Sequence, residues 1–266
     1  MSAFISTFFS WSQIKGVLPS LFEQGLRNTL LISVLALVLG LVLGLVLAVL
    51  LISPRWWVRL PARIYVDVLR GLPAIVTVSL VGIGLPVAGV AIFGTSPFGY
   101  AVLAVGMISA AYIAEIFRSG IQSVPLGQTE AGRSLGMSHL LTLWVIVIPQ
   151  GIRNILPALA NQFIVAVKES ALVYLLGLTA GERDLYFIAS TWEAQTYNSS
   201  SFTAAALVYL CITIPLTYAV NWLDRRLRNG RSARPVPTEL TAPAPVVGLP
   251  AAGPGSAGLA GEARIP

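Results

Sequence analysis

Lys168, Glu169 and Ser170 follow one another inside the long apolar segment 157–178, and they are the residues best placed to do chemistry. A lysine beside a serine can activate a hydroxyl nucleophile, which would suit an enzyme that works within a membrane. The lysine ammonium and the glutamate carboxylate could instead contact a substrate that carries both charges. An ionised group at the centre of a bilayer costs at least ~2.5 kcal/mol, so we expect these residues to be paired or functional.

Two neighbouring amide side chains, Asn161 and Gln162, extend this candidate substrate path. Structural pairing is the other interpretation of Lys168 and Glu169. Adjacent helical positions point about 100° apart, so the two residues cannot easily satisfy each other on one face. Candidate partners for intramembrane ion pairs lie elsewhere in apolar surroundings, at Asp67, Arg70, Glu115 and Arg118.

Metal and nucleotide chemistry are excluded by what the sequence lacks. One histidine, His139, and one cysteine, Cys211, are too few for a metal site. A phosphate-binding loop needs lysine after glycine, whereas the two lysines, Lys15 and Lys168, follow Ile14 and Val167. We therefore expect no metal, no cofactor and no ATP hydrolysis in this chain.

The composition is that of an integral membrane protein. The chain has 266 residues, of which 56% are hydrophobic and only 11% charged, whereas a soluble domain is roughly one quarter charged. About 20 apolar residues suffice for one helical crossing. The sequence therefore predicts an all-α fold in the lipid bilayer, with five transmembrane helices near residues 28–53, 61–84, 98–117, 157–178 and 201–223.

Arginines set the predicted orientation, because cytoplasmic loops are enriched in Lys and Arg close to span ends. Arginines occur in the first and third connections and after the last span, whereas the second connection has no ionisable residue and the fourth is mostly acidic. The N-terminus is therefore predicted outside and the C-terminus in the cytoplasm. The net charge of +6 follows from this arrangement and does not indicate nucleic acid binding.

Three regions follow from this pattern. Residues 1–25 are predicted to form an extracytoplasmic, interfacial segment, and residues 26–228 the transmembrane domain. Residues 229–266 are rich in Pro, Ala and Gly, which is typical of a flexible tail, here cytoplasmic.

A cytoplasmic loop at about 118–156 is too long to be a simple turn, and it contains EAGRSLGMSHLLTLWVIVIP from Glu130 to Pro149. Thr129 is a plausible N-cap for a first short helix, and Gly136 a stop between this helix and a second one. Two short helices meeting at a glycine can dock into a groove of another protein.

The residues of this loop match a known pattern. The spacing of Glu130, Ala131 and Gly132, then Gly136, then Ile146 to Pro149 closely resembles the EAA loop of ABC importer permeases, the segment that docks on the ATPase subunit. Gly132 replaces the second alanine of the pattern, and we expect it to loosen the first helix by up to ~1 kcal/mol. The resemblance assigns ATPase coupling to Glu130, Ala131, Gly132, Gly136, Ile146 and Pro149.

The resemblance covers roughly residues 20–228 and points to the polar-amino-acid subfamily, whose members import histidine, glutamine, glutamate or arginine. It implies the type I ABC importer permease fold in the plasma or inner membrane. It also implies a second permease subunit, identical or paralogous, a cytosolic ATPase dimer that binds ATP and Mg, and an extracytoplasmic amino-acid-binding protein. The identity of the amino acid stays open. The alternatives are a secondary transporter and an intramembrane enzyme.

Overall fold

Helices account for most of the computed structural model, which describes residues 2–229. In hydrocarbon a backbone must satisfy its own hydrogen bonds, which explains why the apolar runs are helical. Within the described residues four helical stretches are long and apolar enough to cross a membrane, and a bent pair would make a fifth. The four stretches are Phe4–Ile52, Pro97–Gln122, His139–Leu176 and Ser200–Leu227.

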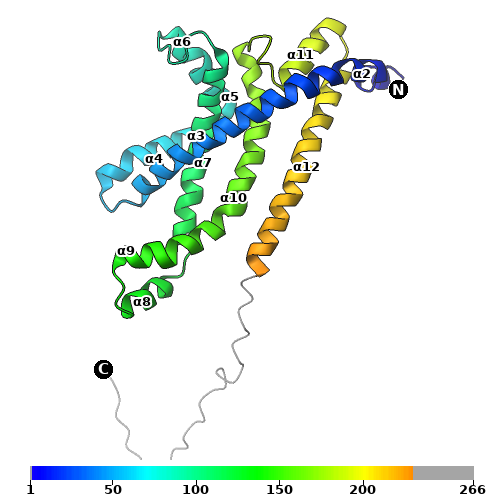
Figure 1. Cartoon of the computed structure of the whole chain (residues 1–266). Coiled ribbons are helices and arrows are strands. Elements are labelled where there is room, and N and C mark those ends of the chain that lie inside the picture. Colours follow the sequence, from blue (N-terminus) through cyan, green and yellow to red (C-terminus); the bar gives the residue numbers. More distant parts are fainter. Residues whose placement is uncertain (1, 230–266) are drawn as a thin grey trace, which may run out of the picture. The chain divides into compact units, whose positions relative to one another are not determined.

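The principal helices are α3 (Leu26–Ile52), α7 (Pro97–Gln122), α10 (Ile148–Glu169) and α12 (Ser200–Asn229). Helix α7 packs against both α3 and α10, and α12 packs against α10 (Figure 1). Helix α3 follows closely the uncharged run that predicted the first span.

Glycines bring α3 and α7 close together. A Cβ atom at Gly44 would lie 2.7 Å from Ile113 Cγ2, and one at Gly40 would lie 2.9 Å from Ser109 Cβ. Across the same contact, a Cβ atom at Gly106 would lie 2.7 Å from Leu39 Cδ2. The two glycines of the GxxxG pattern at 40–44 therefore serve packing within the chain.

One end of the bundle is formed by the N-terminal helices and by α11 (Leu185–Thr196). Helices α1 (Ser2–Phe8) and α2 (Trp11–Ser20) lead through a π-helical turn, η1 (Leu21–Gly25), into α3. This end, called the α11 end below, has an apolar core made by Ile14, Val17, Leu21, Leu185, Ile188, Ala189, Ala204, Ala205 and Val208.

The second predicted span is not one straight helix, which corrects the expectation for residues 61–84. Helix α4 (Trp56–Gly71) is bent by 111° relative to the next stretch, Ala74–Val87. This stretch comprises α5 (Ala74–Ser79), the π-helical η2 (Leu80–Gly84) and α6 (Leu85–Val87). Pro73 explains the break, because a proline disfavours helical backbone in the preceding residue, and Leu72 has a ψ of 141°.

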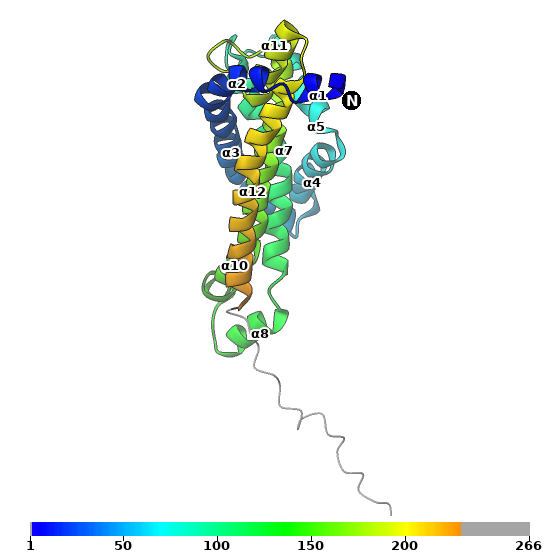
Figure 2. The same cartoon turned by 90° about the vertical axis from the view of Figure 1, so that its right-hand side faces the viewer.

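The opposite end of the bundle, called the α8 end, carries α8 (Leu126–Ser134) and α9 (His139–Thr142) (Figures 1 and 2). A π-helical turn, η3 (Leu143–Val147), joins α9 directly to α10, so the helical stretch starts well before the predicted residue 157. A 3-10 helix, η4 (Ser170–Leu176), continues α10 toward the α11 end. The predicted tail, residues 229–266, lies outside the described residues apart from Asn229.

Candidate functional site

The loop between α7 and α10 forms two short helices that meet at Gly136. Helix α8 ends in a turn in which the Gly136 N–H donates to the Arg133 carbonyl at 3.0 Å and the Met137 N–H to the Gly132 carbonyl at 3.1 Å. Gly136 has a φ of 83°, which glycine adopts without strain. No atom lies within 4 Å of a Cβ built there, so backbone conformation, and not steric blocking of a close bend, explains this glycine.

The start of each short helix is set by a different residue. Helix α8 begins at Leu126 directly after Pro125, so Thr129 lies inside the helix and the prediction that it caps the helix is wrong. Helix α9 begins after Ser138, whose Oγ accepts a hydrogen bond from the Leu141 N–H at 3.2 Å.

Gly132 holds the two short helices together. It is buried, and a Cβ atom there would lie 2.9 Å from Ile146 Cδ1 and 3.0 Å from Thr142 Cγ2. The expectation that Gly132 merely loosens α8 therefore missed its main role, which is to let α8 approach α9 and η3. Of the six residues with a predicted coupling role, Gly132 and Ile146 form this contact.

The other four residues lie on the surface. Glu130, Ala131 and Gly136 are exposed on α8 and its turn, and Pro149 is exposed in the first turn of α10. Two large apolar side chains flank them, Leu126 at 78% and Leu135 at 83% exposure. An exposed patch that mixes apolar and charged side chains is typical of a protein interface.

Next to this segment, α7 and α10 pack closely against each other. A Cβ atom at Gly151 would lie 3.2 Å from the Gly120 carbonyl oxygen, so the two backbones nearly touch. Next to this crossing, Asn154 Nδ2 donates to Ser123 Oγ at 2.6 Å. A displacement of α8 and α9 would therefore reach both helices together.

The candidate substrate path residues separate into two sets on α10 and η4. Asn161 and Lys168 are exposed and seven residues apart, which places them on one face of the helix. Gln162 and Ser170 are buried within the chain, and Ser170 Oγ donates to the Val167 carbonyl at 2.8 Å. Glu169 is half-buried, and its Oε2 has no hydrogen-bond partner among the described residues.

The candidate ion-pair residues have short-range partners. Glu115 accepts from Arg118 of the same helix, with Oε2 at 2.5 Å from Nη2. Asp67 lies 3.8 Å from Arg63 Nε, and Arg70 stacks over the Tyr112 ring at 5.4 Å. Within the described residues no salt bridge involves Lys168.

A buried polar cluster at the α11 end was missed by the sequence interpretation. Asp184 is fully buried and caps α11 by accepting hydrogen bonds from the Tyr186 and Phe187 N–H groups at 3.2 and 3.1 Å. From α3, Asn28 Nδ2 donates to the Gly181 and Arg183 carbonyls, each at 3.0 Å, and Thr29 Oγ1 accepts from the Leu185 N–H at 3.1 Å.

Burial raises the pKa of the Asp184 carboxyl from 3.8 to about 6, although the hydrogen bonds from the two backbone N–H groups oppose the shift. The aspartate before the apolar run LYFI is an N-cap signal that the sequence offered. The sequence interpretation had used it only as a loop charge.

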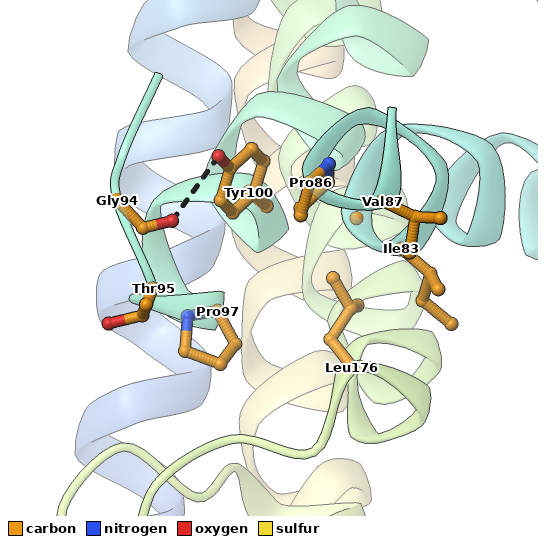
Figure 3. A pocket seen from close by; sticks show the side chains of 9 residues that line it. Ile83, Pro86, Val87, Gly94, Thr95, Pro97, Tyr100 and Leu176 are labelled. Carbon is orange, nitrogen blue, oxygen red and sulfur yellow. Dashed lines mark hydrogen bonds between the residues drawn. The ribbon is translucent and has the colours of Figure 1, made fainter. Parts of the chain in front are cut away.

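A pocket of about 240 Å³ lies where η2, α6 and the start of α7 meet η4 (Figure 3). Its lining includes Ile83, Pro86, Val87 and Leu176. The Tyr100 hydroxyl at its edge lies 3.1 Å from the Val90 carbonyl oxygen and 3.4 Å from the Gly94 carbonyl oxygen, and it donates its one proton to either. No charged side chain lines it, so it offers no partner for an ionised ligand.

Comparison with known proteins decides the family. Residues 36–229 match the family described as the binding-protein-dependent transport system inner membrane component. The chain belongs to this family. It is therefore a membrane transport subunit, and the members of the family that it resembles are permeases and not enzymes.

Among curated relatives, a probable glutamine ABC transporter permease of Bacillus subtilis, GlnM, is 37% identical over 214 residues, which is 79% of this chain and 94% of the relative. The glutamate/aspartate import permease GltK of Escherichia coli is 35% identical over 224 residues, 82% of this chain and 98% of the relative.

Solved structures of ABC transporters agree with the fold. A crystal structure of an amino acid ABC transporter with histidines matches with a TM-score of 0.72 at 35% identity, over 82% of this chain and 98% of that chain. The MetNI methionine ABC transporter in an inward-facing conformation matches with a TM-score of 0.63 at 19% identity, over 76% and 94% of the two chains, and supports the fold alone.

Proposed function

We propose that this chain is the permease subunit of an ATP-driven amino acid importer. The observation that carries the proposal is the pair of short helices α8 and α9, fixed to each other at Gly132 and joined to the crossing of α7 and α10. The relatives named for glutamine and for glutamate/aspartate transport support an amino acid as substrate.

In this proposal the α8 end is cytoplasmic and the α11 end faces outward. Arginines support this orientation, because Arg55 follows the end of α3, and Arg118 and Arg225 lie in the last turns of α7 and α12. The bent pair of α4 with α5 to α6 then makes the second of five spans, and the N-terminus lies outside.

The proposed mechanism is alternating access. A cytosolic ATPase dimer, which would bind ATP and Mg, closes on nucleotide and displaces α8 and α9 through the patch around Glu130 and Leu135. The tight crossing at Gly120 and Gly151 would pass this displacement to α7 and α10, which open the path on the opposite side. A binding protein would deliver the substrate at the α11 end.

We further propose that the face of α10 with Asn161 and Lys168 lines the path, opposite a second permease subunit. A lysine on an exposed helix face in hydrocarbon is unfavourable against lipid and is accommodated by water, a substrate or a partner. The amide and ammonium groups can donate hydrogen bonds to a substrate carboxylate.

A pair of single-cysteine variants tests the orientation and the ATPase contact together. Leu135→Cys and Val87→Cys replace side chains of nearly equal exposure, 83% and 82%, at opposite ends of the bundle. Both are made after the native Cys211 is changed to Ser. A membrane-impermeant thiol reagent should label L135C only in permeabilised cells and V87C in intact cells, and only L135C should cross-link to the coexpressed ATPase. Labelling of L135C in intact cells would refute the orientation.

A further inference from the structure

Helix α4 presents three distinct faces. One face is buried, with Ala62 and Val66 packed in an apolar cluster with Leu51 of α3 and Ala114 of α7. The Tyr65 hydroxyl donates to the Met107 carbonyl at 3.0 Å and fixes the helix against α7. The other two faces have no cover within the described residues.

The second face is apolar and exposed. Trp57, Leu60, Ile64 and Val68 follow one another at spacings of three and four residues, so they share one side of the helix. Their exposed fractions are 59%, 46%, 54% and 47%. Trp56 adds a second indole, whose ring centroid lies 6.2 Å from that of Trp57.

The third face, between the other two, is charged. Arg59, Arg63, Asp67 and Arg70 follow one another at the same helical spacing, and all four are exposed. Arg63 pairs with Asp67 at 3.8 Å, with both side chains about two-thirds exposed, so the stripe keeps a net positive charge.

Helix α4 lies near the ends of α3 and α7, where charged side chains follow the apolar part of each helix. It starts four residues after the last residue of α3, Ile52, and it packs beside Ala114, which directly precedes Glu115 in α7. The 111° bend at Pro73 separates the direction of α4 from that of the following stretch, Ala74–Val87. The first turns of α4 therefore lie at the cytoplasmic edge of the apolar spans, whereas Tyr65, which donates to the Met107 carbonyl, reaches the middle of α7.

We propose that the N-terminal half of α4, where the second span begins, binds anionic phospholipids of the inner leaflet. The apolar face with Ile64 enters the acyl chains, Trp56 and Trp57 lie at the headgroup level, and Arg59 and Arg63 contact lipid phosphates. Amphipathic helices with arginines beside an apolar face and with tryptophan anchors bind membranes in this way. The proposal uses the orientation given above, but its test does not require transport.

A lipid surface fits both uncovered faces better than a second copy of the chain. A protein that covered the apolar face would also remove water from the adjoining arginine stripe, and buried charges are costly unless they are paired. A leaflet boundary supplies hydrocarbon to one face and anionic phosphate to the next face at the same time. Charge complementarity therefore selects the anionic lipid as the occupant.

The test places a photoreactive amino acid at Ile64 in the full chain, reconstituted with its partner subunits in vesicles that contain phosphatidylcholine and a minority of phosphatidylglycerol. Mass spectrometry then identifies the adducts. We expect phospholipid adducts with phosphatidylglycerol enriched about five-fold over its share of the vesicle, because each arginine near an anionic surface contributes a comparable factor. The same probe at Leu135, which is exposed on α8, should give no lipid adduct.

Charge variants distinguish specific binding from general attraction. Arg59→Gln together with Arg63→Gln should bring the phosphatidylglycerol share of the Ile64 adducts down to that of the vesicle. Arg225→Gln, which removes an exposed arginine near the end of α12, should leave the enrichment unchanged. Adducts to a second permease or to the ATPase would overturn the proposal, as would lipid adducts without enrichment in the wild-type chain.

Discussion

Gly132 of α8 faces Ile146 of η3 so closely that a Cβ atom at position 132 would lie 2.9 Å from the Ile146 Cδ1 atom. This contact fixes the angle between the two short helices that we propose as the ATPase docking segment. Ile146 Cδ1 is the flexible end of a side chain and can yield to a single added methyl group, but a longer side chain at position 132 must displace Ile146 and Thr142 together.

We predict that Gly132→Leu lowers ATP-driven uptake and destabilises the segment by about 1–3 kcal/mol, the usual cost of overpacking. Gly127→Leu is the matched control, because no atom lies within 4 Å of a Cβ at Gly127 in the same helix. Uptake in vesicles and thermal unfolding of the purified complex measure the two effects. Equal behaviour of the two variants would show that the contact has no role in coupling.

Gly136 should be sensitive to backbone conformation and not to side-chain volume. Gly136→Val places a β-branched residue at a φ of 83°, which should lower the stability of the segment by about 1–2 kcal/mol. Gly136→Asn should cost less, since asparagine tolerates left-handed backbone. We expect coupled uptake to be highest in the wild-type protein, lower in Gly136→Asn and lowest in Gly136→Val. An asparagine variant as impaired as the valine variant would contradict this explanation.

Stability should depend on the ionisation of Asp184. Because its folded pKa of about 6 lies above 3.8, protonation favours the folded state. This contribution is fully present below pH 3.8 and is lost as the pH rises through 6. Asp184→Asn keeps a cap acceptor without the charge. It should therefore flatten the dependence of the unfolding temperature on pH in this window.

At pH 7, keeping the buried Asp184 carboxylate ionised costs up to roughly 3 kcal/mol of folding free energy, at 1.36 kcal/mol per unit of pKa. Asp184→Asn should recover part of this free energy. The measurement is thermal unfolding of the complex between pH 4 and pH 7. Glu182→Gln, which removes a half-buried carboxyl from the same loop, is the control. A wild-type profile identical to that of Asp184→Asn would refute the assignment.

Lys168 should affect transport more than assembly. We expect Lys168→Gln to reduce the maximal uptake rate about ten-fold, since a hydrogen bond to a charged group contributes about 1.5–3 kcal/mol. The other lysine of the chain, Lys15, stacks on Trp11 at the α11 end, and Lys15→Gln should leave uptake unchanged. The amount of assembled complex is measured beside uptake. A loss of uptake fully explained by lost complex would assign Lys168 a structural role.

The features that could be predicted from the sequence are those that depend on composition and on local residue patterns. The uncharged run after Asn28 located α3, and the glycine in the loop located the turn at Gly136. These features follow from single helices and need no knowledge of how the helices pack.

Features that depend on packing between helices were missed or misinterpreted. Gly132 looked like a weak point of a helix because Ile146, which it contacts, is fourteen residues away. Asp184 looked like a loop charge because its burial depends on α3 and α12. The bend before Pro73 was hidden by an apolar run that continues on both sides of it.

The central claim is that this permease moves an amino acid only when an ATPase is docked on α8 and α9. The direct measurement is uptake of radiolabelled amino acids into vesicles that contain the chain, its ATPase and its binding protein, with ATP supplied on the ATPase side. We predict uptake that requires ATP and the ATPase, and that falls in the Gly132→Leu variant and not in Gly127→Leu. Uptake that persists without ATP or without the ATPase would contradict the account.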